Sequence, residues 1–142
     1  MAHQYCIVQD EGRVRIVTLN RPEVLNALHA DANDELAAVN GWAMGGGFET
    51  ALACDIIVAA ENAVFALPEP RVGLIAGAGG VHRLPRIIPQ KQALGMILTG
   101  RRVTAAEGKE LGFVNEVVPA GQALSAAKRW AELILECSPS AL

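Results

Sequence analysis

Two glutamates stand in surroundings where carboxylates are rare. Glu49 lies within the apolar run of residues 48–54, and Glu69 stands between two prolines in a segment with hydrophobic neighbours. Burial raises the pKa of a carboxyl group, and two nearby carboxylates with separated pKa values supply an acid and a base at neutral pH. The pair therefore favours general acid/base chemistry. Each residue also has an ordinary interpretation, a first-turn helix charge for Glu49 and a solvated loop residue for Glu69.

Three consecutive glycines precede the first of these glutamates. Gly45, Gly46 and Gly47 lead into good helix formers, so we predict that a helix begins there. Free N–H groups at a helix start, together with the helix dipole, stabilise negative charge on an oxygen that approaches the backbone. The triplet completes neither a dinucleotide-binding fingerprint nor a phosphate-binding loop. It predicts an oxyanion site, with tight backbone packing as the alternative.

The elements that must position these groups alternate between strands and helices. Two β-branched runs, residues 5–9 and 13–19, predict a hairpin with a short loop. The residues LNAL (25–28) then lead towards a short helical stretch, at most about three turns long, that ends near Val39. The continuous apolar run 56–60 is typical of a strand buried on both faces. This alternation predicts an α/β fold in a single domain.

The second half of the chain has sharper boundaries. A weaker strand and an irregular Pro-rich loop lead to a glycine cluster at residues 77–80. Thr104 and Glu107 fit a capping box, and Gly112 suits the end of the same helix. The predicted strands cover 63–67 and 113–118, and the predicted helices cover 81–86, 90–98, 105–111 and 122–137. In the last helix we expect one buried face made of Leu124, Ala127, Ala131, Ile134 and Leu135.

Composition excludes several classes of function. The 142 residues carry 12 basic and 15 acidic side chains, a net charge of −3, which argues against a nucleic-acid partner. No apolar run approaches the roughly 20 residues of a membrane span, and no signal or transit peptide is recognised, so we expect a cytoplasmic protein. Metal-ligand spacing is absent as well. Three cysteines, interpreted as buried thiols in a reducing compartment, complete this picture: Cys6, Cys54 and Cys137.

Four segments resemble one known family in its own order along the chain. They are NRPEVLNAL (20–28), NGWAMGGGFETALACD (40–55), FALPEPRVGLIAGAGG (65–80) and LTGRRVTAAEGKELGFVNEVV (98–118). With these motifs the chain is similar to the enoyl-CoA hydratase/isomerase family, the crotonase superfamily. The resemblance implies a crotonase-like (ClpP/crotonase) fold of repeated ββα units, here incomplete. We also interpret the glycine cluster at 77–80, which matches the family loop after the second acid, as a scaffold turn that supports the site and is not itself a contact.

The resemblance further implies an enzyme that adds water to trans-2-enoyl-CoA thioesters. In that picture the Gly46 N–H polarises the thioester carbonyl, and Gly45 and Ala27 complete the oxyanion and substrate-binding residues. Glu49 orients and activates the water, while Glu69 exchanges the proton at the carbon next to the thioester. No metal or redox cofactor is implied, because water addition to a thioester-activated alkene needs only polarisation and proton transfer. CoA enters as part of the substrate. The family assembles into trimers or hexamers, so a homo-oligomer is the implied partner state.

One family section is missing between about residues 38 and 39, and the family also continues beyond residue 142 into helices used in assembly. In the family the missing section supplies the second oxyanion N–H and much of the pocket for the CoA adenine. Losing one such donor costs on the order of 100- to 1,000-fold in rate. Three alternatives to the hydratase therefore remain open: an enoyl-CoA isomerase, a carnitinyl-CoA-type dehydratase, and a catalytically impaired truncated relative that acts only in assembly.

Overall fold

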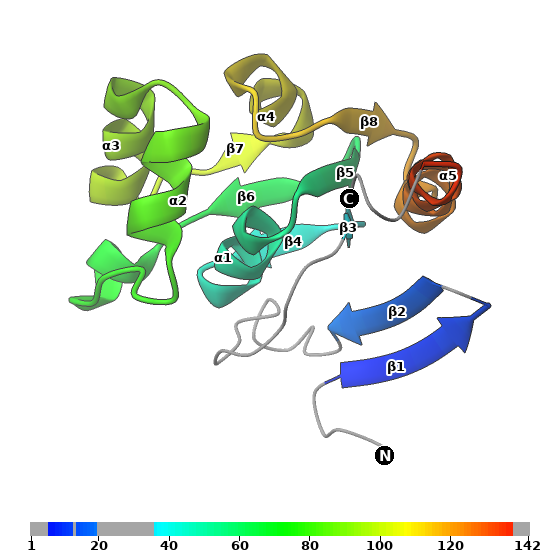
Figure 1. The fold of residues 1–142 in the computed structure, drawn as a ribbon. Coiled ribbons are helices and arrows are strands. Elements are labelled where there is room, and N and C mark those ends of the chain that lie inside the picture. Colours follow the sequence, from blue (N-terminus) through cyan, green and yellow to red (C-terminus); the bar gives the residue numbers. More distant parts are fainter. Residues whose placement is uncertain (1–5, 13, 20–35, 138–142) are drawn as a thin grey trace.

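The computed structural model describes residues 6–12, 14–19 and 36–137 (Figure 1). The chain opens with an antiparallel hairpin of β1 (Cys6–Glu11) and β2 (Val14–Leu19), which confirms the predicted one. Its strands pair as far as Glu11 and Val14, so the turn is tighter than the sequence indicated. Gly12 takes a φ of 62° in that turn, a value that favours glycine.

Two further three-stranded sheets form the body of the molecule. The first consists of parallel strands in the order β3 (Leu36–Val39), β5 (Ile56–Ala60) and β8 (Glu116–Val118). In the second, β6 (Val64–Ala66) lies between β4 (Trp42–Met44), which is parallel to it, and β7 (Val103–Thr104), which is antiparallel.

The helix predicted to end near Val39 is wrong over its last four residues, which form β3. Leu36 and the alanines after it are good helix formers, but each residue of β3 pairs with β5, from Leu36 with Ile56 to Val39 with Ala59. Pairing with a neighbouring strand therefore overrides local propensity here. The part of that predicted helix before Leu36 lies outside the described residues.

The helices follow the sequence prediction closely. The helix expected at the three glycines begins there, and the later ones begin and end within two residues of their predicted bounds. The segment after Pro68, expected as an irregular loop, instead contains a short 3₁₀ helix. The helices are α1 (Gly46–Ala53), η2 (Glu69–Val72), α2 (Gly80–Ile87), α3 (Gln90–Thr99), α4 (Ala105–Leu111) and α5 (Ala123–Leu135). In Figure 1, α2 and α3 lie at one end of the sheets and α5 at the other.

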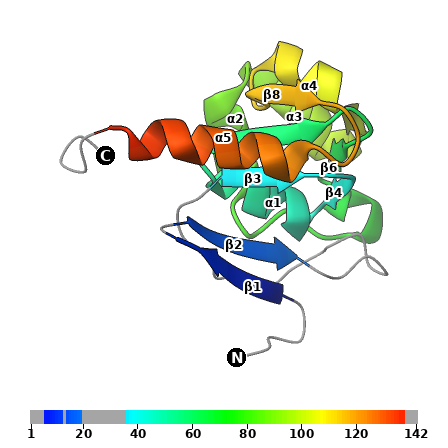
Figure 2. The same ribbon diagram turned by 90° about the vertical axis from the view of Figure 1, so that its right-hand side faces the viewer.

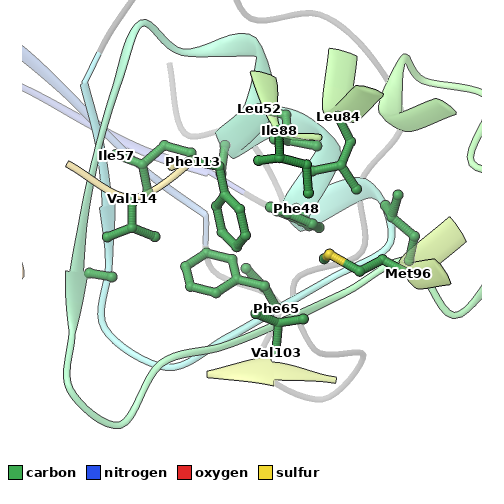
Figure 3. Packing of buried hydrophobic residues seen from close by; sticks show 14 of the residues in the cluster. Phe48, Leu52, Ile57, Phe65, Leu84, Ile88, Met96, Val103, Phe113 and Val114 are labelled. Atoms are coloured by element: carbon green, nitrogen blue, oxygen red, sulfur yellow. The ribbon is translucent and has the colours of Figure 1, made fainter. Parts of the chain in front are cut away.

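Three phenylalanines form the centre of the main hydrophobic core (Figure 3). Phe48 of α1, Phe65 of β6 and Phe113 before β8 have ring centroids 5.1 to 5.2 Å apart. Tilted and edge-on ring pairs at this separation attract one another beyond their buried area. The cluster therefore fixes the start of α1 against β6, the strand that leads into Glu69.

β5 is buried on both faces, as its continuous apolar sequence predicted. Ile57 and Ala59 belong to the core around the phenylalanines, whereas Val58 and Ala60 belong to a second cluster with alanines of α5. Figure 2 shows α5 lying along this sheet. The buried side chains of α5 are alanines, namely Ala123, Ala126, Ala127 and Ala131. The predicted buried face is wrong at Leu124 and Leu135, both 38% exposed, because the small side chains are the ones that face the sheet.

The cysteine prediction is corrected in part. Cys137, expected to be buried, is exposed, because it follows the last turn of α5. Cys54 is partly buried, and its thiol donates a hydrogen bond to Thr50 O at 3.4 Å. The side chain of Cys6 lies outside the described residues.

The cap of α4 gives a first testable prediction. Thr104 Oγ1 accepts a hydrogen bond from Glu107 N at 3.2 Å, as the capping box predicted. The Glu107 carboxylate does not complete the box, because it pairs with Arg101 at 2.7 Å. We expect Thr104→Ala to lower the free energy of unfolding by about 1 kcal/mol, and Thr104→Ser to leave it nearly unchanged. Urea denaturation of the three proteins measures both effects, and equal losses in the two variants would refute the capping role.

Candidate active site

The parallel pairing of β4 with β6 brings the two predicted glutamates to one place. Met44 is paired with Ala66, and Gly45 N donates a hydrogen bond to Ala66 O at 2.9 Å, so the two strands end side by side. The chain continues from β4 into α1 and from β6 into η2. The carboxyl ends of adjacent parallel strands are where open α/β sheets place their ligands. Glu49 of α1 and Glu69 of η2 both follow this edge directly.

Gly45 makes the sharp turn from β4 into α1. Its φ of 54° and ψ of −123° are a conformation that favours glycine over residues with a side chain. The first hydrogen bond at the start of α1 runs from Glu49 N to Gly45 O at 2.9 Å, so the N–H groups of Gly46 and Gly47 precede it. A helix start of this kind carries partial positive charge. The predicted oxyanion residues therefore stand at the positive end of α1.

Glu69 lies directly against this turn. A Cβ atom placed on Gly45 would lie 2.7 Å from Glu69 Oε1, so the carboxylate occupies the space that glycine leaves. Its other oxygen, Oε2, is buried and meets no hydrogen-bond donor in the part of the chain that the structure describes. A buried acceptor without a partner is costly and rare in folded proteins.

The surroundings of Glu69 raise its pKa above the ordinary value of 4.5. Burial of the carboxylate is the main cause, a hydrogen bond from its own backbone N–H opposes it, and the negative charge of Glu49 adds to the rise. The prediction of a raised pKa is thus confirmed for Glu69.

Glu49 is only 4% exposed, which is rare for a residue with a carboxyl group. Its Oε1 accepts a buried hydrogen bond from Gly80 N, at the start of α2, at 2.9 Å. Gly80 therefore supports the site through Glu49, which agrees with the interpretation of residues 77–80 as a scaffold turn. This hydrogen bond was not predicted from the sequence, although the glycine pair precedes a helix in the same way as the glycines before Glu49 do.

The short helix η2 is held from the side of α3. Arg71 Nε donates a hydrogen bond to Thr99 O at 3.2 Å, and Gly100, with a φ of 59°, ends α3 beside Pro68. These contacts fix the backbone on which Glu69 stands.

The structure thus brings Glu49, Glu69, Gly45 and Gly46 together, four of the five residues predicted for the site. The fifth, Ala27, lies outside the described residues. Among the described residues there is no group of three or more His, Cys, Asp or Glu side chains that could hold a metal ion. Nor does any described helix combine the length and apolar character needed to cross a membrane.

Comparisons with known proteins agree on one family. The model of the enoyl-CoA hydratase/isomerase family matches residues 36–142. A carnitinyl-CoA dehydratase of Salmonella paratyphi A is 47% identical over 107 residues, which are 75% of this chain and 41% of that protein. Among solved structures, a carnitinyl-CoA dehydratase from Mycobacterium avium superposes with a TM-score of 0.88 at 32% identity, over 96% of this chain and 78% of that one. An enoyl-CoA hydratase from Mycobacterium tuberculosis superposes with a TM-score of 0.88 at 30% identity, over 98% of this chain and 79% of that one.

The chain belongs to the enoyl-CoA hydratase/isomerase family and has the crotonase fold. It spans 41% of the length of the curated relatives that it matches. The family match begins at residue 36 and therefore includes β3, where a helix had been predicted.

Proposed function

We propose that this chain is a lyase of the hydratase type, which adds water to trans-2-enoyl-CoA thioesters. The observation that carries the proposal is the buried, unpartnered Oε2 of Glu69 beside the positive end of α1. A carboxyl group of raised pKa in such a place can hold a proton at a pH where an exposed glutamate has lost it. The neighbouring Glu49 supplies the second carboxylate that hydration requires.

In the proposed reaction the thioester carbonyl oxygen lies against the Gly46 N–H at the start of α1. Glu49 removes a proton from water while the hydroxyl group adds to C3 of the enoyl chain. The electrons of the double bond move towards the thioester, and the charge that develops on its oxygen is stabilised by the N–H group and the helix dipole. Glu69 then delivers its proton to C2, which completes the addition of one water molecule.

A second candidate is the dehydration of carnitinyl-CoA, which would use the same groups in reverse. The 47% identity to a protein named carnitinyl-CoA dehydratase favours this substrate. Loss of water needs Glu69 to remove the proton from C2 and Glu49 to protonate the leaving hydroxyl group.

The proposal also covers cofactors, domain organisation, oligomeric state and location in the cell. The chemistry needs no metal or redox cofactor, because the thioester itself activates the double bond and CoA is part of the substrate. We further propose one crotonase-like domain over residues 1–142, a homo-oligomeric state, and a location in the cytoplasm, where thiols such as those of Cys54 and Cys137 stay reduced.

The test is hydration of a short trans-2-enoyl-CoA by the purified chain, measured as loss of enoyl absorbance. Carnitinyl-CoA is assayed in parallel through the gain of that absorbance. We expect turnover of at least one substrate above the rate without protein, and its loss in Glu49→Gln. A folded protein, verified by circular dichroism, that turns over neither substrate would contradict the proposal and favour a role in assembly.

A further inference from the structure

The turn before α2 touches the predicted water-activating glutamate. Gly79 has a φ of 116° and directs the N–H of Gly80 towards the interior, where it donates the 2.9 Å hydrogen bond to Glu49 Oε1. Hydrogen bonds to carboxylates are stronger than those between neutral groups, and the positive end of a helix favours negative charge. The Glu49 side chain is therefore fixed by an element that contributes no side chain to the site.

The same turn leaves no room for a larger residue. A Cβ atom on Gly80 would lie 3.1 Å from Glu49 Cγ, 3.0 Å from Leu67 Cδ2 and 3.1 Å from Ala76 Cβ. Contacts this short force the neighbours to move by a few tenths of an ångström. The backbone of Gly80 is helical, so the requirement for glycine comes from the Glu49 side chain and its neighbours, with no contribution from backbone strain.

Arg83 holds the turn from outside. Its guanidinium donates a hydrogen bond to Ala78 O at 3.1 Å, and its backbone N–H donates one to Gly79 O at 2.8 Å. The guanidinium occupies the space where a side chain on Gly79 would stand. Arg83 is exposed, so its contacts serve the turn and bury little apolar surface.

We infer that residues 78–80, clamped by Arg83, form a positioning turn that aligns Glu49 for the reaction. The Gly80 N–H holds Oε1 in place, which leaves Oε2 to accept the proton of the reacting water. Gly80 and Arg83 act through Glu49 and are positioning residues. This inference rests on the proposed hydratase function, and displacements below an ångström are enough to reduce rates.

The first test compares Gly80 with a helical glycine that has room for a side chain. We expect Gly80→Ala to lower kcat roughly 30-fold and to change KM less than about threefold, because the substrate contacts are untouched. Gly95→Ala, on the neighbouring helix α3, is the control: a Cβ there would meet nothing within 4 Å, and its φ is not positive. It should not lower the melting temperature and should leave kcat within about twofold. Equal kcat values for Gly80→Ala and the wild type would overturn the inference.

A second pair of variants avoids the risk of misfolding. We expect Arg83→Ala, at an exposed position, to lower kcat roughly fivefold, because the turn loses its clamp. Arg86→Ala removes an exposed arginine from the last turn of the same helix and should leave kcat unchanged. An equal fall in both arginine variants would indicate a general charge effect and reject the clamp.

A double-mutant cycle distinguishes alignment of Glu49 from a general structural effect. Glu49→Asp shortens the side chain, so it withdraws the carboxylate from Gly80 but keeps measurable activity. If Gly80 acts through Glu49, adding Gly80→Ala to this variant lowers kcat by less than about threefold. If kcat of the double variant instead falls by the product of the two single-variant losses, the inference is overturned. A wild-type chain without turnover rejects the proposed function itself, whereas an active wild type with an unaffected Gly80→Ala rejects only the positioning turn.

Discussion

Glu69→Gln should lower the hydration rate on the order of 1,000-fold and, at neutral pH, make the protein more stable. The amide has nearly the shape of the carboxyl group but cannot exchange a proton, and general acid/base catalysis contributes 100- to 10,000-fold as a rough range. Stability rises because the fold disfavours the ionised form of Glu69: its Oε2 is buried without a hydrogen-bond donor, its Oε1 lies against Gly45, and Glu49 is a second carboxylate in the same site. Steady-state kinetics and thermal unfolding of the same preparations measure the two effects.

The gain in stability has a definite pH dependence. The pKa of Glu69 is raised from 4.5 in the folded protein, so between 4.5 and the raised pKa the folded state binds more protons than the unfolded chain. The free energy of unfolding of the wild type therefore falls as the pH rises through the folded pKa. In Glu69→Gln, which has no carboxyl group at this position, the free energy of unfolding does not fall in this way. Its melting temperature should exceed that of the wild type near neutral pH and approach it below pH 4.5.

Glu110→Gln is the matched control for this prediction. Glu110 is exposed on α4, so its substitution should leave both the rate and the pH dependence of stability unchanged. A Glu69→Gln protein that is inactive but also less stable than the wild type at neutral pH would assign Glu69 a structural role instead. A substitution that lowers the rate but raises stability is typical of a residue that serves function at a cost in stability.

The sequence predicted most elements because local signals marked their ends. The helix at 105–111 was bounded by Thr104 and Gly112, and the structure shows both the cap and a left-handed Gly112 with a φ of 102°. Strand 56–60 was recognised from its unbroken apolar run, and its two faces lie in two separate hydrophobic clusters. Such signals act within a few residues and are therefore readable from one sequence.

The errors arose where distant residues decide the structure. Leu36–Val39 is a strand because it pairs with β5, a partner about twenty positions later, while its own residues favour a helix. The buried face of α5 is lined by alanines, because the side that faces the sheet is set by packing against β3 and β5. Periodicity identified this helix but placed Leu124 and Leu135 on its buried side.

The candidate site depends both on local sequence signals and on contacts between residues far apart in the chain. Residue types and the family resemblance pointed to Glu49 and Glu69, but their proximity follows from the register of β4 with β6, which pairs Met44 with Ala66. No pattern in the short segment Trp42–Met44 predicted a strand. The hydrogen bond from Gly80 to Glu49 joins residues 31 positions apart, and it depends on how α2 packs against α1.

Gly45→Ala should affect both halves of this site at once. A Cβ at this position would lie 2.7 Å from Glu69 Oε1, so the carboxylate must move. The φ of 54° with a ψ of −123° is also unfavourable for alanine, which would shift the N–H groups at the start of α1. We expect the hydration rate to fall at least about 100-fold, because both the proton donor and the oxyanion site are displaced.

The same substitution should lower the free energy of unfolding by about 1 to 3 kcal/mol, the usual cost of a backbone held in an unfavourable region. Gly41→Ala is the control from the same segment, because a Cβ there would meet nothing within 4 Å and its φ is not positive. It should change the free energy of unfolding by less than about 0.5 kcal/mol and leave the rate intact. Comparison of the two alanine variants distinguishes the effect of replacing any glycine in this segment from the effect of changing the turn at Gly45. If Gly45→Ala kept the wild-type rate, neither the contact of Gly45 with Glu69 nor the start of α1 would be required for the reaction.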